Sequence, residues 1–271
     1  MLKRILVAVV FVPLIFVLFF LAPPWCLPIV TAAISMIAVH EVLWSTGFVK
    51  NVRISCYSIV LAGLIPIWVY FSGGMYLALA GILVYVVLLF SEAISSHYTV
   101  TMEKMGGAFF FSVIIPMFLA SFIRISKMEL GIYMVLMPLV AAFTSDAFAL
   151  FAGMLFGKHK LAPELSPKKT VEGAVGGFVG AIVCMMIYGA IMQFGFQLQA
   201  HYLLLALYGA AGSAISQLGD LSFSYIKRQY KIKDYGNILP GHGGILDRFD
   251  SVILCAPLIE LLIIFLPALA L

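Results

Sequence analysis

Two aspartates and an arginine stand directly before the last apolar run of the chain: Asp247, Arg248 and Asp250. A glycine pair precedes them, and a helix that begins near Ile245 places the two aspartates three residues apart on one face. Clustered carboxylates repel one another unless they are protonated or bridged by a cation. Hard oxygen ligands of this kind suit Mg²⁺, especially when phosphate oxygens complete its shell.

A further carboxylate lies inside the preceding apolar run. Gly212, Ser216, Asp220 and Ser224 recur every fourth residue and therefore share one face of a helix, which Lys227 continues. Small residues at this spacing can also serve only to pack two membrane helices, but a packing seam has no need of an aspartate. Charged groups at membrane depth usually face a protein interior or a water-filled cavity. The stripe therefore favours function over packing.

Asp146 and Glu260 are the other carboxylates inside long apolar runs. Asp146 has small residues at helical spacing around it, as Asp220 does, and is a second candidate for the same site. Glu260 follows Pro257 in an otherwise apolar run. For Glu260, a structural hydrogen-bonding role and a catalytic role both remain open.

The composition indicates an integral membrane protein. Of 271 residues, 63% are hydrophobic and only 10% charged, with a mean hydropathy of +1.12, which excludes an ordinary soluble domain. A helical span needs about 20 mostly apolar residues. We therefore predict an all-α polytopic protein with about nine transmembrane helices. The predicted spans are 5–22, 25–44, 54–71, 74–90, 106–123, 130–152, 173–194, 202–223 and 251–269.

The basic residues predict the orientation, because short cytoplasmic loops are rich in Lys and Arg. With the N-terminus in the cytoplasm, only Arg124 and Lys127 of the 16 Lys and Arg residues fall outside. This bias and contact with anionic lipid account for the formal net charge of +4 without a nucleic-acid partner. We expect a protein of the cell's inner (cytoplasmic) membrane whose active site faces the cytoplasm.

Polar residues divide the chain unevenly. Residues 1–105 are predicted to form scaffold helices. Glu41 and Glu92 fall near the cytoplasmic ends of predicted spans, where carboxylates stay hydrated. Residues 106–271 form the predicted catalytic region, with cytoplasmic loops at 153–172 and 224–250. Between the halves, residues 91–105 fit either an interfacial amphipathic helix or a solvated loop. The four cysteines stand singly and are interpreted as packing residues.

The loop 157–173 is basic and rich in turn residues. Ser166 and Pro167 resemble a helix N-cap followed by proline at the first helical position, which would put Lys168 and Lys169 in the opening turn of a helix. Backbone N–H groups and lysine charge at such a position favour an anionic ligand. The usual cytoplasmic excess of lysine explains any single one of these residues, but for the whole loop we favour phosphate binding.

A second basic stretch precedes the glycine turn. It carries Lys227, Arg228, Lys231 and Lys233, and its glycines would let the backbone approach phosphates. His242, taken alone, fits an ordinary loop histidine. Two basic loops and several carboxylates at one membrane face predict phosphoryl or nucleotidyl transfer to a membrane lipid, with a divalent cation.

The stretch SYIKRQYKIKDYGNILPGHGGILDRFD, residues 224–250, resembles the signature of the phosphatidate cytidylyltransferases, also called CDP-diacylglycerol synthases. The block SDAFALFAGMLFGKHKLAPELSPKKTVEG, residues 145–173, is similar to a second block of that family. The likeness covers most of residues 140–271, while the first hundred residues match only in being hydrophobic. The signature positions matched are Ser224, Lys227, Arg228, Lys233, Asp234, Gly236, Pro240, His242, Gly243, Gly244, Asp247, Arg248 and Asp250.

The resemblance implies condensation of CTP with phosphatidate to CDP-diacylglycerol and pyrophosphate for phospholipid biosynthesis. It also implies Mg²⁺, with K⁺ as a second ion, and a homodimer. The catalytic residues it implies are Asp220, Lys227, Asp247 and Asp250, and the metal ligands are Asp146, Asp220 and Asp247. The substrate-binding residues it implies are Lys168, Lys169, Ser224, Arg228, Lys233, His242, Gly243, Gly244 and Arg248.

Two other functions fit parts of the pattern. A CTP-dependent lipid kinase would attack the γ-phosphorus and release CDP, but the long signature argues against it. A transporter could line its path with Asp146, Asp220 and Glu260, although the chain shows neither paired repeats nor broken helices. Ether lipids remain alternatives to ester lipids as acceptors in the same chemistry.

Overall fold

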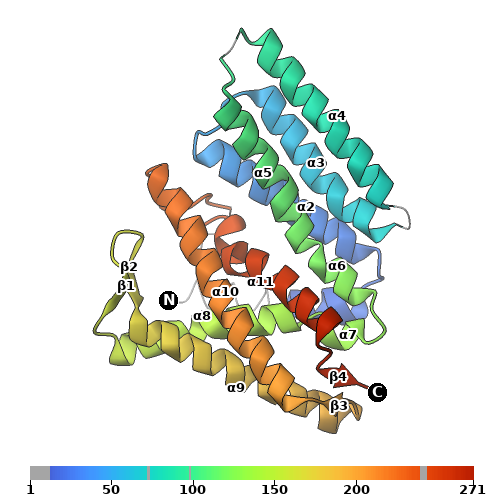
Figure 1. The fold of residues 1–271 in the computed structure, drawn as a ribbon, viewed down its shortest axis with the longest axis vertical. Coiled ribbons are helices and arrows are strands. Elements are labelled where there is room, and N and C mark those ends of the chain that lie inside the picture. Colours follow the sequence, from blue (N-terminus) through green and yellow to red (C-terminus); the bar gives the residue numbers. More distant parts are fainter. Residues whose placement is uncertain (1–12, 72–73, 98, 239–242) are drawn as a thin grey trace. The chain divides into compact units, whose positions relative to one another are not determined.

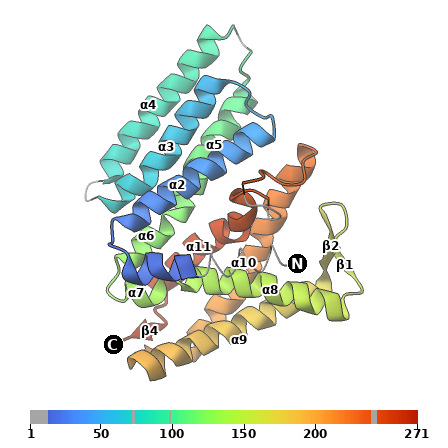
Figure 2. The same cartoon turned by 180° about the vertical axis from the view of Figure 1, so that it is seen from behind.

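The computed structural model describes residues 13–71, 74–97, 99–238 and 243–271, and most of them are helical (Figures 1 and 2). The α-helices are α2 Cys26–His40, α3 Val52–Tyr70, α4 Gly74–Ser95, α5 Met102–Leu119, α6 Ser121–Ser126, α7 Gly131–Met134, α8 Met137–Phe156, α9 Val171–Phe196, α10 Tyr202–Gln229 and α11 Leu246–Phe265. Two π-helical turns are η1 Val17–Leu21 and η2 Glu41–Ser45. The short strands are β1 Lys160–Ala162, β2 Ser166–Thr170, β3 Gln199–Ala200 and β4 Leu269–Ala270.

The all-α fold class is confirmed, and helices occupy every predicted span within the described residues. Seven helical segments of the described chain are long and apolar enough to cross a membrane. The last predicted span, 251–269, corresponds to α11 but is not among those seven, and the first predicted span is described only from residue 13. The count of nine and the cytoplasmic N-terminus therefore stay predictions.

The chain divides into two compact units. The first comprises Met1–Arg124 and Gln229–Arg248, and the second comprises Ile125–Arg228 and Phe249–Leu271. Helix α11 therefore begins in the first unit and continues in the second. The sequence-based division at residue 105 rests on where polar residues accumulate, and it stays a prediction about function.

In the first unit, α2, α3, α4 and α5 lie side by side (Figure 1). A buried chain of hydroxyl groups links three of these helices: the Tyr85 hydroxyl lies 2.7 Å from Ser58 Oγ and 3.3 Å from Ser112 Oγ. Such hydrogen bonds stabilise helix pairs where surrounding lipid offers no partner. These hydrogen bonds therefore connect α3, α4 and α5 within an otherwise apolar interior.

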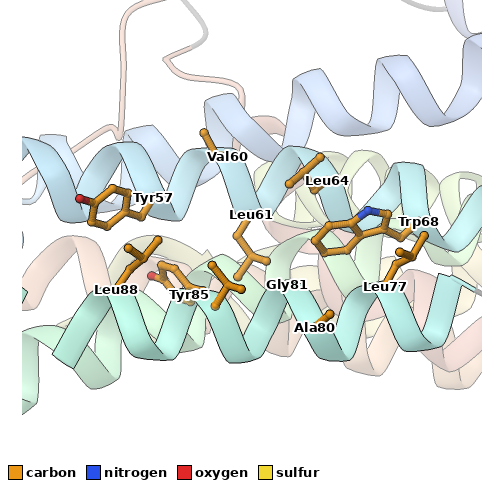
Figure 3. A pocket seen from close by; sticks show the side chains of 11 residues that line it. Tyr57, Val60, Leu61, Leu64, Trp68, Leu77, Ala80, Gly81, Tyr85 and Leu88 are labelled. Carbon is orange, nitrogen blue, oxygen red and sulfur yellow. The ribbon is translucent and has the colours of Figure 1, made fainter. Parts of the chain in front are cut away.

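A groove of about 360 Å³ runs between α3 and α4 (Figure 3). Trp68 and Leu77 line one end and Tyr57 and Leu88 the other, and no charged residue contributes to its wall. Most of α4 is exposed in the structure although its side chains are apolar, as expected of a helix that faces lipid. The groove therefore belongs to the hydrophobic exterior and offers no group for phosphate chemistry.

In the second unit, α8 and α9 pack along much of their length. Glycines permit the close approach: a Cβ atom on Gly177 would lie 2.6 Å from the Ser145 carbonyl oxygen. The Ser145 and Ser213 hydroxyls are 2.7 Å apart, and Gln217 Nε2 donates to Ser213 Oγ at 3.1 Å and to the Ala174 carbonyl at 3.1 Å. These contacts hold α8, α9 and α10 together and fix the orientation of α10.

The segment 91–105 is not one helix. Helix α4 continues to Ser95 and α5 begins at Met102, with Thr101 as its N-cap, whose side chain accepts a hydrogen bond from the Lys104 N–H. The described residues between the two helices form turns and bends. A separate interfacial helix is therefore wrong, and the loop is shorter than the predicted segment, because residues 91–95 belong to α4 and residues 102–105 to α5.

Candidate active site

Three carboxylates and a lysine of the second unit form a charged cluster around Asp250. Asp250 on α11 interacts with Asp220 and Lys227 on α10 and with Asp146 on α8. Lys227 Nζ lies 3.7 Å from Asp250 Oδ2, and both side chains are about nine-tenths buried. Buried carboxylates are costly unless they are paired with opposite charge or hydrogen-bonded. The cluster thus brings together four residues that the sequence singled out.

Ser251 completes the surroundings of Asp146. Its hydroxyl donates to Asp146 Oδ2 at 3.0 Å, and its backbone N–H donates to Asp250 Oδ1 at 2.9 Å. Ser251 is 1% exposed. Sequence reasoning missed this residue because a serine in an apolar run is ordinarily a packing residue, and only the neighbouring Asp250 could have drawn attention to it.

A second lysine enters the cluster from the strand β2. Lys169 Nζ lies 2.5 Å from Asp220 Oδ2, and about a quarter of each side chain is exposed. Ser224, one helical turn after Asp220, donates to Asp220 Oδ1 at 3.3 Å. The aspartate therefore has a cation and a hydroxyl as partners. With Asp146, Asp220 and Asp250 against Lys169 and Lys227, the formal charge of the cluster is −1.

The strands β1 and β2 form an antiparallel hairpin (Figure 1). The hairpin carries Lys169 to Asp220 on α10. At its tip, Arg228 Nε donates to the Leu165 carbonyl at 3.0 Å. At its base, Glu172 accepts hydrogen bonds from the Lys158 N–H at 3.0 Å and the His159 N–H at 3.2 Å, and lies 2.6 Å from His159 Nδ1. The hairpin is thus tied to α9 and α10 at both ends.

The hairpin corrects the predicted helix start at Ser166 and Pro167. Residues 166–170 are strand β2, and α9 begins at Val171 with Thr170 as its N-cap, whose Oγ1 accepts from the Gly173 N–H at 3.1 Å. Neighbouring residues of a strand project to opposite sides. Lys168 is accordingly exposed, while Lys169 reaches Asp220. The error arose because β-pairing with residues 160–162 outweighed a local capping pattern.

Two further glycines of α10 show how closely this helix packs against its neighbours. Gly219 faces α11, because a Cβ atom there would lie 2.7 Å from the Asp250 carbonyl oxygen. Gly209 faces α9, where a Cβ atom would lie 2.6 Å from Ile182 Cα. The packing interpretation of small residues on this helix is therefore confirmed on two of its sides, and the functional interpretation of the Asp220 stripe stays a prediction.

Asp247 lies in the first unit, at the start of α11, which begins within one residue of the predicted Ile245. Its Oδ2 atom accepts hydrogen bonds from the Tyr235 N–H at 2.7 Å and the Gly244 N–H at 3.0 Å. The residue is 6% exposed. Carboxylates are favourable at helix N-termini because unpaired N–H groups and the helix dipole converge there. Its assignment as a metal ligand stays a prediction.

The glycines of the turn make room for carboxylates. Gly243 has φ +82°, a backbone conformation that side chains rarely adopt, and a Cβ atom there would lie 2.8 Å from Asp247 Oδ2. A Cβ atom on Gly244 would collide with the carboxylate of Glu41. The proposed contact of both glycines with substrate stays a prediction.

Glu41 is a residue whose place the sequence analysis got wrong. Instead of a hydrated side chain at a span end, it is 3% exposed and accepts hydrogen bonds from the Ile245 N–H at 3.0 Å and the Leu246 N–H at 2.8 Å. The sequence around Glu41 does not indicate that its hydrogen-bond partners lie about 200 residues away. The only local signal that this residue is special is a carboxylate within an apolar run.

The remaining predicted residues are distributed as follows. Lys233 and Arg248 are exposed, and His242 lies outside the described residues. Glu260 is 6% exposed on α11. Their roles stay predictions.

The donor atoms of the second-unit cluster fit a hard divalent cation. Within the described residues, no group of three or more His, Cys, Asp or Glu side chains is arranged around one metal position. Mg²⁺ commonly takes only one or two protein carboxylates and completes its shell with water and substrate phosphates. Asp146, Asp220 and Asp250 offer only oxygen ligands, so the donor set suits Mg²⁺ bound together with a nucleotide.

A model of the cytidylyltransferase family matches residues 2–266, nearly the whole chain. The chain belongs to the cytidylyltransferase family. The match includes the carboxylates of the second-unit cluster, Asp247 and the β1–β2 hairpin. It also extends over the first hundred residues, where the sequence alone offered only hydrophobicity. The predicted resemblance and enzyme class are thereby confirmed.

Individual members of the family are similar over half to three quarters of the chain. The chain is 37% identical over 212 residues to a phosphatidate cytidylyltransferase of Bacillus subtilis. This match covers 75% of this chain and 77% of the relative. A phosphatidate cytidylyltransferase of Rickettsia conorii is 34% identical over 184 residues, 66% of this chain and 79% of the relative. One of Staphylococcus haemolyticus is 42% identical over 134 residues, about half of each chain.

Proposed function

We propose that this integral membrane protein condenses CTP with phosphatidate to form CDP-diacylglycerol and pyrophosphate, a step of phospholipid biosynthesis. The observation that carries the proposal is the match to the cytidylyltransferase family over residues 2–266, with relatives at 34–43% identity named phosphatidate cytidylyltransferases. The cluster of carboxylates and lysines supports it, because the reaction transfers a highly charged group.

In the proposed reaction, a phosphate oxygen of phosphatidate attacks the α-phosphorus of CTP. The bond from that phosphorus to the oxygen bridging the β-phosphate breaks, and pyrophosphate leaves with the electron pair. The nucleophile is already an anion, so no strong general base is required. The main tasks of the protein are to neutralise charge and to align the two phosphates.

The residues that would neutralise this charge are the two clustered lysines. Lys169 is paired with Asp220 at 2.5 Å and Lys227 with Asp250 at 3.7 Å, so each ammonium group has a carboxylate beside it before substrate arrives. Arg228 is positioned by the hairpin through the Leu165 carbonyl. Such preorganised cations lower the barrier because they need not reorient as charge develops on the leaving group.

In the second unit, Asp220 would hold Mg²⁺, with Asp146 and Asp250 nearby. Asp247 as a metal ligand rests on the family resemblance. When bound, Mg²⁺ supplies charge neutralisation for the phosphate oxygens. K⁺ as a second ion rests on the family resemblance.

We further propose that the site faces the cytoplasm, in the cytoplasmic membrane. The support is the segregation of Lys and Arg on the side of the hairpin and of the stretch 224–250. A homodimer rests on the family resemblance, and light scattering of the purified protein in detergent tests it.

The experiment that tests the function follows labelled CTP with purified full-length protein in detergent, with and without phosphatidate, and with Mg²⁺ or EDTA. The proposal expects pyrophosphate and a CDP-lipid only when phosphatidate and Mg²⁺ are both present. Release of CDP would instead identify a lipid kinase. Absence of nucleotide turnover with phosphatidate and with its ether-linked analogue would refute the proposal.

A further inference from the structure

We infer that Glu41 is a positioning residue of the reaction, which holds the start of α11 so that the carboxylate of Asp247 is correctly placed. The inference rests on the proposed function, because the role of Asp247 comes from it. Glu41 lies outside the family-like blocks 145–173 and 224–250, and all residues in the argument belong to the first unit.

The first line of support is the geometry of Glu41. Its two carboxylate oxygens are divided between two consecutive N–H groups: Oε1 accepts from Ile245 at 3.0 Å and Oε2 from Leu246 at 2.8 Å. These are first-turn donors of α11, which have no partner within the helix. The residue itself is 3% exposed. A carboxylate buried to this degree is costly, and its charge is used here to bind the helix start.

The second line of support is the fit of the glycine turn around the same carboxylate. A Cβ atom on either Gly236 or Gly244 would collide with the Glu41 side chain. Two glycines at signature positions are therefore required by the packing of Glu41 against the turn.

The third line of support is the link to Asp247. The Gly244 N–H donates to Asp247 Oδ2 at 3.0 Å, while the next two N–H groups donate to Glu41. Three successive backbone donors are thus shared between two carboxylates. Loss of Glu41 frees two of them and removes the contact that fixes the turn, so the Asp247 carboxylate can shift.

The local backbone at Glu41 is unusual as well. Glu41 is the first residue of η2, a π-helical turn that follows α2 directly. Such turns are rare and occur frequently at functional sites. Farther along, Phe48 contacts Tyr230 edge to face at 5.6 Å. The segment 41–48 therefore contacts the stretch that leads to α11 near both of its ends.

The arrangement also affects how phosphates can bind. A helix N-terminus is commonly an anion site. At α11 the N–H groups of residues 244–246 are already hydrogen-bonded to Asp247 and Glu41. These three N–H groups are therefore occupied by carboxylates, and this helix start is used to position Asp247.

The test compares Glu41→Ala and Glu41→Gln with Glu92→Gln in the full-length protein. Glu92 is a matched control, since it is a carboxylate of the same unit that accepts from Asn51 Nδ2 at 2.8 Å and has no described contact with the turn. Hydrogen exchange of the peptide 243–249 and the kcat and KM for CTP are measured for each variant, per amount of folded protein.

A positioning role predicts faster exchange at residues 244–246 in both Glu41 variants and unchanged exchange in Glu92→Gln. It predicts a fall in kcat of about 10²-fold for Glu41→Ala with KM for CTP changed less than about threefold, since a small misplacement of a reacting group costs rate rather than binding. Glu41→Gln keeps one acceptor oxygen, so its kcat should fall by only about tenfold.

A second variant checks the coupling. Gly244→Ala should slow the wild-type enzyme because its Cβ atom meets Glu41, but should add little in the Glu41→Ala background, because the three atoms nearest to that Cβ position all belong to the removed carboxylate. Unchanged exchange at residues 244–246, wild-type kcat in Glu41→Ala, or fully additive effects would overturn the inference. If the wild-type protein fails to turn over CTP and phosphatidate, the proposed function fails instead, and the exchange result still decides whether Glu41 holds the turn.

Discussion

Lys169 Nζ lies 2.5 Å from Asp220 Oδ2, so a lysine of the basic hairpin and a carboxylate within a membrane helix form one ion pair. Fifty-one positions separate the two residues in the sequence. The pair joins the hairpin β1–β2 to α10 and places a cation where the proposed reaction needs both a lysine and a metal-linked carboxylate. Substrate phosphates and Mg²⁺ would each bind to one member of this pair.

Replacement of Lys169 should be far more damaging than replacement of Lys168. Lys169→Met removes an ammonium group fixed by Asp220, and we expect kcat/KM for CTP to fall by about 10–10²-fold, as for other preorganised charges. Lys168 is also implied in substrate binding by the family resemblance, but it is exposed and lies on the opposite side of the strand, so we expect a smaller loss of kcat/KM for Lys168→Met than for Lys169→Met. Steady-state pyrophosphate release measures both. Equal losses in the two variants would contradict the placement of Lys169.

Asp220 and Asp247 should both be essential for turnover. Asp220→Ala and Asp247→Ala remove carboxylates proposed to bind Mg²⁺, and we expect losses of at least about 10²–10³-fold in kcat. The control is Glu164→Gln, on the exposed part of the hairpin, which should retain wild-type activity. Pyrophosphate release over a range of Mg²⁺ concentrations is the measurement. Retained activity in both alanine variants would rule out the metal assignment.

Gly219 should not tolerate a side chain. A Cβ atom there would lie 2.7 Å from the Asp250 backbone carbonyl, so Gly219→Ala must push α10 and α11 apart at the carboxylate cluster. We expect a loss of about 1–3 kcal/mol of stability, as for other overpacked sites, together with reduced activity. Gly195→Ala is the control, because no atom lies within 4 Å of its Cβ position and alanine favours the helix. Thermal unfolding in detergent compares the two; a Gly219→Ala protein as stable as wild type would disprove the close contact.

The hairpin should be labelled from the cytoplasmic side only. In a protein whose four cysteines are replaced by alanine, a membrane-impermeant thiol reagent should modify Glu164→Cys in inside-out vesicles and Glu129→Cys in right-side-out vesicles. Both positions are exposed in the structure. Labelling of both residues from the same side would contradict the predicted topology of this region.

Much of the fold and of the second-unit cluster could be predicted from the sequence. Long apolar runs fix where helices cross a membrane, because backbone polar groups cannot remain unpaired in lipid. Residues on one face of a helix follow from its period, which is why Asp220, Ser224 and Lys227 were expected together. Charge in an apolar run marks Asp146 and Asp220 as exceptional, since only a bound partner offsets its cost.

The sequence by itself thus determined the class of protein, the positions of the helices and the family, because periodicity, hydropathy and a long signature are local properties of the chain. The tertiary structure decided which groups meet. Strand pairing turned Ser166–Thr170 from a helix start into a hairpin that sends Lys169, but not Lys168, to Asp220. Packing brought Glu41 to N–H groups 204 and 205 residues away. Contacts of that kind depend on how helices assemble, and no local pattern records them.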